Sequence, residues 1–178
     1  SFAVDMARAG DIVSTEFIHP GSVIVRFRIH KDSYDLPVYD KLTTLYGNIY
    51  KLVKDKKVIS AYAIGFGGIV EAVSKMAFGN KLGVTLNSAL DEKEIFLPDY
   101  GSIITELKKD DLKLLSDYGF AQEDYDVIGE VIEDEVFRYR DATISIDEAY
   151  ASWTGTLEDV YPTRTETGVN NFETRLYD

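Results

Sequence analysis

The sequence predicts an α/β (mixed α+β) fold, with a central mixed β-sheet and helices packed mainly on one face. Three observations carry this prediction. A β-type run over residues 58–64 enters a glycine-rich turn, an amphipathic helical segment follows, and a second β-type run covers residues 82–86. Strand, turn, helix and strand in this order are typical of a crossover connection in a sheet.

The first elements along the chain predict a β-hairpin. Residues 12–18 and 22–29 are extended runs, and they are separated by His19, Pro20 and Gly21. Pro-Gly is a strong turn signal, and apolar residues alternate with others in the second run. We therefore expect the two runs to pair with each other.

An amphipathic helix is expected next, because apolar residues recur at three- and four-residue steps, as on one helical face. These residues are Tyr39, Leu42, Tyr46, Ile49 and Val53. Four lysines close the helix and its exit: Lys51, Lys54, Lys56 and Lys57. Cations suit the C-terminal end of a helix dipole, so the lysines indicate a solvated helix end. A patch that steers phosphate is the alternative.

The crossover itself is expected to start with a buried strand over residues 58–64. In the helix that follows the glycine turn, four apolar residues share one face: Ile69, Val73, Met76 and Ala77. Gly79 and Asn80 both accept positive φ, which predicts a C-cap at that position. The alternating residues 82–86 then predict the second strand.

The remaining elements are shorter. We expect strands over residues 101–107, 127–132, 136–139 and 142–146, a short helix over 110–118, and helical character over 147–153. The polar, turn-rich residues 161–171 predict a linker or tail. The domain is therefore expected to cover residues 1–152, and a linker residues 153–178.

Composition excludes several function classes. The chain of 178 residues has 31 acidic and 19 basic residues and a net charge of −12, which would repel nucleic acid and anionic membranes. It has no cysteine, so thiolate catalysis, disulfides and cysteine-ligated metals are excluded. No signal peptide and no membrane-spanning run are evident, so a cytoplasmic location is expected.

The residues that commonly carry catalysis show no supporting pattern. His19 and His30 lack the spacing of a helical metal site, and no serine lies in a Gly-x-Ser-x-Gly elbow. Acidic runs such as residues 133–135 offer oxygen ligands for Mg²⁺, but in so acidic a chain they indicate solvated surface. We therefore expect no metal site.

The glycine turn is the remaining candidate site. Gly65, Gly67, Gly68 and Ile69 bring backbone N–H groups to a helix N-terminus, where hydrogen bonding and the helix dipole both favour an anion. The turn lacks the Gly-Lys-Ser/Thr ending of a P-loop, and its spacing does not fit Gly-x-Gly-x-x-Gly. Phosphate binding and tight strand–helix packing both remain open on these residues alone.

Residues 61–79, with Gly-Gly-Ile at 67–69 and Lys-Met-Ala-Phe-Gly at 75–79, resemble the aminoimidazole ribonucleotide synthetase superfamily. Within it, the chain is most similar to the second C-terminal synthetase-like domain of the large phosphoribosylformylglycinamidine synthases. Segments 14–22, 34–37, 98–102 and 153–163 extend the similarity over most of the chain.

The resemblance implies a domain of a multidomain ligase. Such enzymes use ATP and Mg²⁺ to activate formylglycinamide ribonucleotide, and then add ammonia that a glutaminase domain releases from glutamine. The partners implied are the preceding synthetase-like domains and that glutaminase domain, and the isolated domain is expected to be inactive. In this family the glycine turn faces phosphate-bearing ligands, which implies phosphate or nucleotide binding by Gly65, Gly67, Gly68 and Ile69.

The chain departs from the family pattern directly before the turn. Many relatives carry Asp-x-Ser-Asp there, whereas this chain has Ala63, Ile64, Gly65 and Phe66. Binding would then depend on backbone amides alone, and catalytic residues are not assigned. The alternative is a structural domain with a vestigial phosphate-binding turn, in which aromatic residues dock onto a neighbouring domain or drive dimerisation of the isolated domain.

Overall fold

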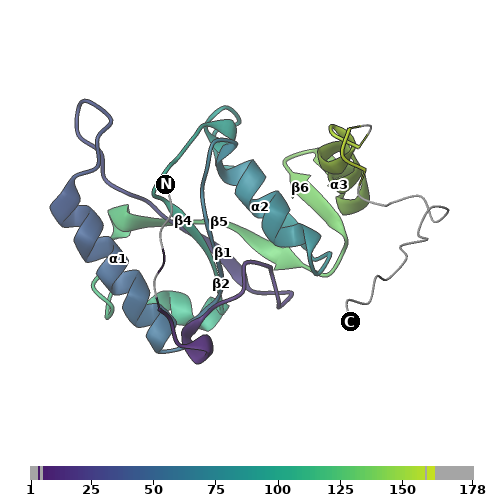
Figure 1. Cartoon of the computed structure of the whole chain (residues 1–178). Coiled ribbons are helices and arrows are strands. Elements are labelled where there is room, and N and C mark those ends of the chain that lie inside the picture. Colours follow the sequence, from purple (N-terminus) through teal and green to yellow (C-terminus); the bar gives the residue numbers. More distant parts are fainter. Residues whose placement is uncertain (1–3, 5, 159, 163–178) are drawn as a thin grey trace, which may run out of the picture.

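A mixed β-sheet forms the centre of the protein (Figure 1). The computed structural model describes residues 4, 6–158 and 160–162, and seven strands lie within them. The strands are β1 (Val23–Phe27), β2 (Val58–Ala63), β3 (Gly83–Leu86), β4 (Ile103–Leu107), β5 (Tyr125–Ile132), β6 (Val136–Tyr139) and β7 (Ala142–Ser145). Their order is β2-β4-β1-β5-β3-β6-β7, and all neighbours are antiparallel except β3 and β6.

Three α-helices and four short 3-10 helices accompany the sheet in the described residues. The α-helices are α1 (Tyr39–Lys54), α2 (Gly68–Phe78) and α3 (Ile146–Gly155). The 3-10 helices are η1 (Ala9–Asp11), η2 (Glu94–Phe96), η3 (Lys109–Leu114) and η4 (Gln122–Asp124). None of the helices in this part of the chain combines the length and apolar content that crossing a membrane requires.

Two hydrophobic clusters show how the helices cover the sheet. Ile24 of β1 packs in the cluster that contains α2, η2 and the first residue of α3. Val25 and Phe27 of the same strand pack in the second cluster, against α1. Because successive residues of a strand point to opposite faces, α1 lies on the other face from α2 and α3. The mixed sheet of an α/β fold is confirmed, with two of the three α-helices on one face.

The first predicted helix is confirmed as α1, but its buried stripe differs from the expected one. Leu45, Ile49 and Leu52 are buried, whereas Tyr39 is 70% exposed and Tyr46 39%. Aliphatic side chains thus fill the contact with the sheet, and the tyrosines lie along its margin. Tyr46 on this margin lines a pocket.

The predicted N-terminal hairpin is wrong. Strand β1 pairs with β4 and β5 on its two sides, so neither edge is left for residues 12–18. Ser14 instead forms an isolated parallel bridge with Ser60 of β2. The turn is real, since the Ser22 N–H donates to the His19 carbonyl at 3.2 Å and Gly21 has a φ of 84°.

A buried carboxylate explains the path of the segment before β1. Glu106 of β4 is fully buried, and it accepts hydrogen bonds from the backbone N–H groups of Ile18 (2.9 Å) and His19 (2.8 Å). It also accepts from the hydroxyls of Ser22 (2.7 Å) and Ser60 (2.8 Å). These four donors hold the turn over the sheet face, so a local Pro-Gly signal does not produce a hairpin.

The crossover is confirmed. Strands β2 and β3 run parallel with three strands between them, and α2 connects them across the sheet. Strand β2 lies at an edge of the sheet and is only partly buried, in contrast to the buried strand expected. The expected helical face of α2 is buried.

The helix cap differs from the expected one. Gly79 has right-handed helical geometry with φ −66°, and the positive φ of 54° falls on Lys81. A Cβ at Gly79 would meet the carboxylate of Glu16, which is the flexible end of that side chain and would have to move aside.

The C-terminal strands and the last helix agree with the sequence in order, and the predicted helix over residues 110–118 does not form. Strands β4 to β7 lie where strands are expected, and η3 replaces the predicted helix over 110–118. Helix α3 continues through residue 152 to Gly155. Most of residues 161–171 lies outside the described residues, and the division of the chain at 152 stays a prediction.

Candidate functional site

The glycine turn connects the end of β2 to the start of α2 and packs closely against η2. Gly68 has a φ of 69°, and a Cβ there would lie 2.7 Å from the Ile95 carbonyl oxygen and 2.6 Å from that of Leu97. A side chain at this position therefore has neither a suitable backbone conformation nor room. The glycine permits a close approach of two backbone segments.

The anion position of the turn holds a carboxylate of the protein itself. The Gly67 N–H donates a 2.7 Å hydrogen bond to Oε2 of Glu71, and Lys75 Nζ donates to Oε1 at 2.6 Å. The Lys75 hydrogen bond, followed by that from Gly67, lowers the pKa of the Glu71 carboxyl below its ordinary value. A Cβ at Gly67 would lie 2.6 Å from Cβ of Glu71, so glycine permits this approach too.

The four residues expected to bind phosphate come together in one turn, but they are not equally available. Gly65 is half-buried, and its carbonyl accepts a 3.4 Å hydrogen bond from the Gly68 N–H. The Gly67 N–H is used by Glu71, and Gly68 and Ile69 are buried. Sequence reasoning missed Glu71, although an acid four residues after Gly67 in the first helical turn was a usable signal.

A network around a buried guanidinium supports the wall behind the turn. Arg26 of β1 is 4% exposed and donates to both carboxylate oxygens of Asp126 at 3.0 Å. It also pairs with Glu94 of η2 at 3.3 Å and with Asp99 at 3.7 Å. Since η2 packs on Gly68, these ion pairs fix the backbone that the turn contacts. The network therefore has a structural role.

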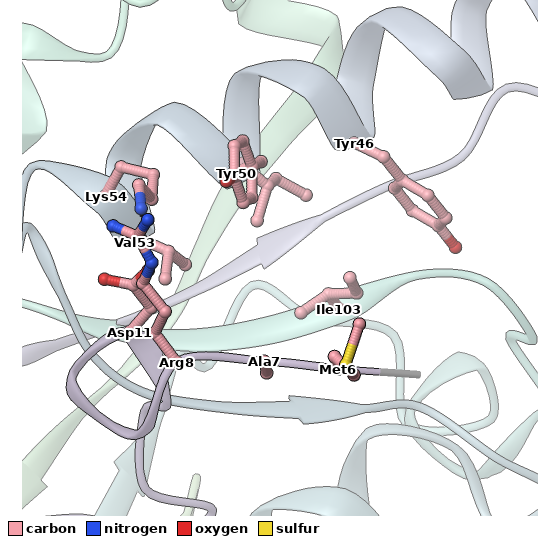
Figure 2. Close-up of a pocket in the computed structure, with 10 residues that line it drawn as sticks. Met6, Ala7, Arg8, Asp11, Tyr46, Tyr50, Val53, Lys54 and Ile103 are labelled. Carbon is pink, nitrogen blue, oxygen red and sulfur yellow. Dashed lines mark hydrogen bonds and ion pairs between the residues drawn. The ribbon is translucent and has the colours of Figure 1, made fainter. Parts of the chain in front are cut away.

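A separate pocket of about 820 Å³ lies between the N-terminal segment, α1 and β4 (Figure 2). Tyr46 and Tyr50 project from α1, and Ile103 of β4 and Met6 lie opposite them (Figure 2). The Tyr46 hydroxyl donates to the Gly101 carbonyl at 2.8 Å, and burial raises its pKa. The pocket thus combines aromatic rings with an apolar floor.

The charge at one end of this pocket is positive. Lys54 and Lys56 share a single carboxylate, that of Asp11, at 2.7 and 3.8 Å, and the Asp11 hydrogen bond raises the pKa of Lys54. Arg8 points toward the end of α1 beside Lys54 (Figure 2), and within the described part of the chain its guanidinium has no ion pair. Within the described residues, two positive charges near Tyr50 therefore have no carboxylate partner of their own. This local positive charge is opposite in sign to the net charge of the chain, which is −12.

No metal centre is evident among residues 4, 6–158 and 160–162, where no three acidic or histidine side chains gather closely enough to hold an ion. The two histidines make different contacts. The His30 ring is hydrogen-bonded to Asp124 at 2.7 Å, and the His19 backbone forms the turn before β1.

Comparison with known proteins finds PurL proteins that are similar in sequence and in fold. The chain is 35% identical to the phosphoribosylformylglycinamidine synthase subunit PurL of Pelagibacter ubique over a 117-residue alignment, which covers 61% of this chain and 16% of the relative. No family model matches the sequence. The chain spans about a sixth of the length of that relative.

Solved structures agree with the sequence comparison in fold. Thermotoga maritima PurL complexed with ATP matches at a TM-score of 0.61 with 20% identity, over 79% of this chain and 27% of that one. The PurLQS structure from the same organism matches at 0.64 with 20% identity, over 79% of this chain and 28% of that one. The chain therefore shares its fold with part of the PurL structures, and its sequence is similar to that of PurL over 61% of its length.

Proposed function

We propose that this chain is the C-terminal synthetase-like domain of a phosphoribosylformylglycinamidine synthase. The reaction is the ATP- and glutamine-dependent amidation of formylglycinamide ribonucleotide in purine biosynthesis. The observation that carries the proposal is the 35% identity to PurL, together with the shared fold. The chain spans 16% of that relative, and under this proposal the rest of the active site would belong to other domains.

The proposal names the partners and cofactors that the reaction needs. Preceding synthetase-like domains and a glutaminase would complete the enzyme. ATP would supply the transferred phosphoryl group, and Mg²⁺ would neutralise its charge. The enzyme would be cytoplasmic. Residues 1–152 would form the domain, and residues 153–178 the connector. By itself the domain would be inactive, because phosphoryl transfer depends on groups positioned from several sides.

The pocket beneath α1 is the better supported site for the nucleotide within this domain. Arg8 supplies a guanidinium without an ion pair in the described residues, and Lys54 and Lys56 add a net positive charge next to it. Guanidinium groups bind phosphate oxygens in a bidentate manner. The exposed ring of Tyr50 offers a face on which a base can stack.

Phosphate binding at Gly65, Gly67, Gly68 and Ile69 remains a proposal with one condition. The Glu71 carboxylate would have to leave the Gly67 N–H before a phosphate could take its place, because two anions would repel each other there.

The competing proposal is a docking role with a vestigial turn. Phe66, Phe96 and Leu97 surround the turn and are 77, 58 and 57% exposed, which gives an apolar rim that a neighbouring domain could cover.

A genetic complementation assay tests the proposed function. A bacterial strain that lacks PurL is supplied with the gene of the protein that carries this chain, and it is expected to grow without added purines. Accumulation of the folded protein without growth would contradict the assignment. In the purified protein, Arg8→Gln should raise the KM for ATP, and Lys41→Gln, which changes an exposed cation outside the pocket, is the matched control.

A further inference from the structure

A second pocket, of about 670 Å³, lies between the C-terminal end of α2 and helix α3. It is distinct from both the glycine turn, which lies at the opposite end of α2, and the pocket beneath α1. Aromatic side chains form much of its wall, namely Tyr62, Phe78, Tyr150 and Trp153. None of these residues has a role in the proposed amidation.

The aromatic side chains form one packed unit that is still open to a ligand. Trp153 stacks on Phe78 with ring centroids 5.4 Å apart and an interplanar angle of 20°. Tyr150 contacts both rings edge-on, at 5.9 and 5.3 Å. Trp153 and Tyr150 nevertheless remain 55 and 45% exposed, so part of each ring faces the pocket and solvent.

The charges around the pocket leave one carboxylate uncompensated. Lys75 is paired with Glu71 at 2.6 Å, and Lys81 with Asp147 at 2.8 Å. Glu16 lines the same pocket, and its carboxylate makes no hydrogen bond or ion pair within the described residues. Among the described residues that line the pocket, Glu16 is therefore the one charged group without a partner. Lys75 Nζ lies 6.0 Å from the centroid of the Trp153 ring, so this ring already attracts a cation.

The Glu16 carboxylate also lies at an electrostatically unfavourable position. Its carboxylate lies against Gly79, at the C-terminal end of α2, where a Cβ would collide with it. The C-terminal end of a helix carries partial negative charge, so a carboxylate there is disfavoured unless a cation joins it. A positive group in the pocket would relieve this repulsion.

We propose that this pocket binds an organic cation, a guanidinium or alkylammonium group, through Glu16 and the rings of Trp153 and Tyr150. Cations are attracted to the faces of tryptophan and tyrosine, and a flat guanidinium also stacks on them. An arginine of a neighbouring protein domain and a free small molecule are the two possible sources of the group. Both sources share this chemistry.

Trp153 is the one tryptophan of the chain, so its fluorescence reports directly on the pocket. Titration with acetyl-arginine amide or agmatine should change the emission in a saturable way. Acetyl-citrulline amide, which is neutral and of similar shape, should bind at least tenfold more weakly. Tighter binding of acetyl-arginine amide indicates a protein side chain as the natural source, and tighter binding of agmatine indicates a free molecule.

Three variants complete the test. Glu16→Gln should weaken binding of the better probe at least tenfold, and Glu133→Gln, which removes an exposed carboxylate elsewhere, should leave it unchanged. Tyr150→Leu should weaken binding while Trp153 still reports. Equal affinity for the citrulline and arginine probes, or unchanged affinity in Glu16→Gln, would overturn the proposal. Thermal melting confirms that each variant is folded.

Discussion

The carboxylate of Glu71 accepts a 2.7 Å hydrogen bond from the backbone N–H of Gly67, so the glycine turn binds an anion that belongs to its own helix. Lys75 holds the other oxygen of the same carboxylate. A helix N-terminus of this kind attracts phosphate in many proteins, and here an internal side chain satisfies the same electrostatic preference. The turn is thereby stabilised without a ligand.

Glu71→Gln should destabilise the protein at neutral pH by about 1 kcal/mol, because a charged acceptor is lost from two hydrogen bonds on a partly exposed side chain. The pKa of Glu71 is lowered in the folded state, relative to an ordinary value of 4.5. Its contribution is therefore present above pH 4.5 and is lost as the pH falls through the lowered pKa. Urea unfolding of both proteins from pH 7 to pH 2 measures this.

The control for this variant is Glu148→Gln, which changes a glutamate in the first turn of α3 that has no ion pair within the described residues. Its effect should be smaller at every pH. A wild-type advantage over Glu71→Gln that persists unchanged at pH 2 would contradict the assigned role of the carboxylate.

Gly68→Ala should cost about 2 kcal/mol or more, because it combines a positive φ with backbone collisions at η2. Gly47→Ala is the matched control, since a Cβ at Gly47 in α1 meets nothing within 4 Å. That control should stabilise the protein by about 0.5–1 kcal/mol, because alanine favours a helix interior. Equal effects of the two substitutions in chemical denaturation would show that the close packing against η2 is not important.

Glu106→Gln should destabilise the protein by about 3 kcal/mol or more, because the buried carboxylate accepts from four donors and an amide NH₂ would face two of them. Glu130→Gln, on the neighbouring part of the sheet, should change stability by about 0.5 kcal/mol or less. Hydrogen exchange at Ile18 and His19 should accelerate only in the first variant. Unchanged protection of both amides would contradict the role of Glu106.

Arg26→Met should cost about 3–5 kcal/mol, since it leaves Asp126 and Asp99 without their buried cation. Arg28→Met removes an arginine whose side chain is 41% exposed and should cost about 1 kcal/mol or less. The amide signals of η2 should move in the Arg26 variant, because Glu94 loses its partner. A small stability loss with unmoved η2 signals would contradict the network.

Helices and strands with strong local periodicity were predicted correctly from the sequence. The apolar face of α2 and the strands on both sides of it follow from spacing alone, because burial of one helical face and alternation along a strand are local properties. The hairpin failed because its cause is not local. Glu106 lies 84 residues after Ser22, and the sequence shows no sign that this carboxylate would bind the turn.

The candidate site was likewise predictable only where its residues are close together in the sequence. The glycines that form the turn are contiguous, so their meeting at a helix start follows from sequence. The pocket beneath α1 joins Arg8, Tyr50 and Ile103, which are far apart in the chain and share no motif. Its positive charge depends on how Asp11 is shared between two lysines, and only the tertiary structure specifies that.

Titration of the ¹⁵N-labelled chain with ATP and Mg²⁺, followed by backbone amide NMR, tests the central claim most directly. We expect shifts centred on Arg8, Tyr50 and Lys54, little change at Gly67, and affinity about tenfold or more weaker in Arg8→Gln. Shifts confined to residues 67–69, or no shifts anywhere at millimolar nucleotide, would contradict nucleotide binding in the pocket beneath α1.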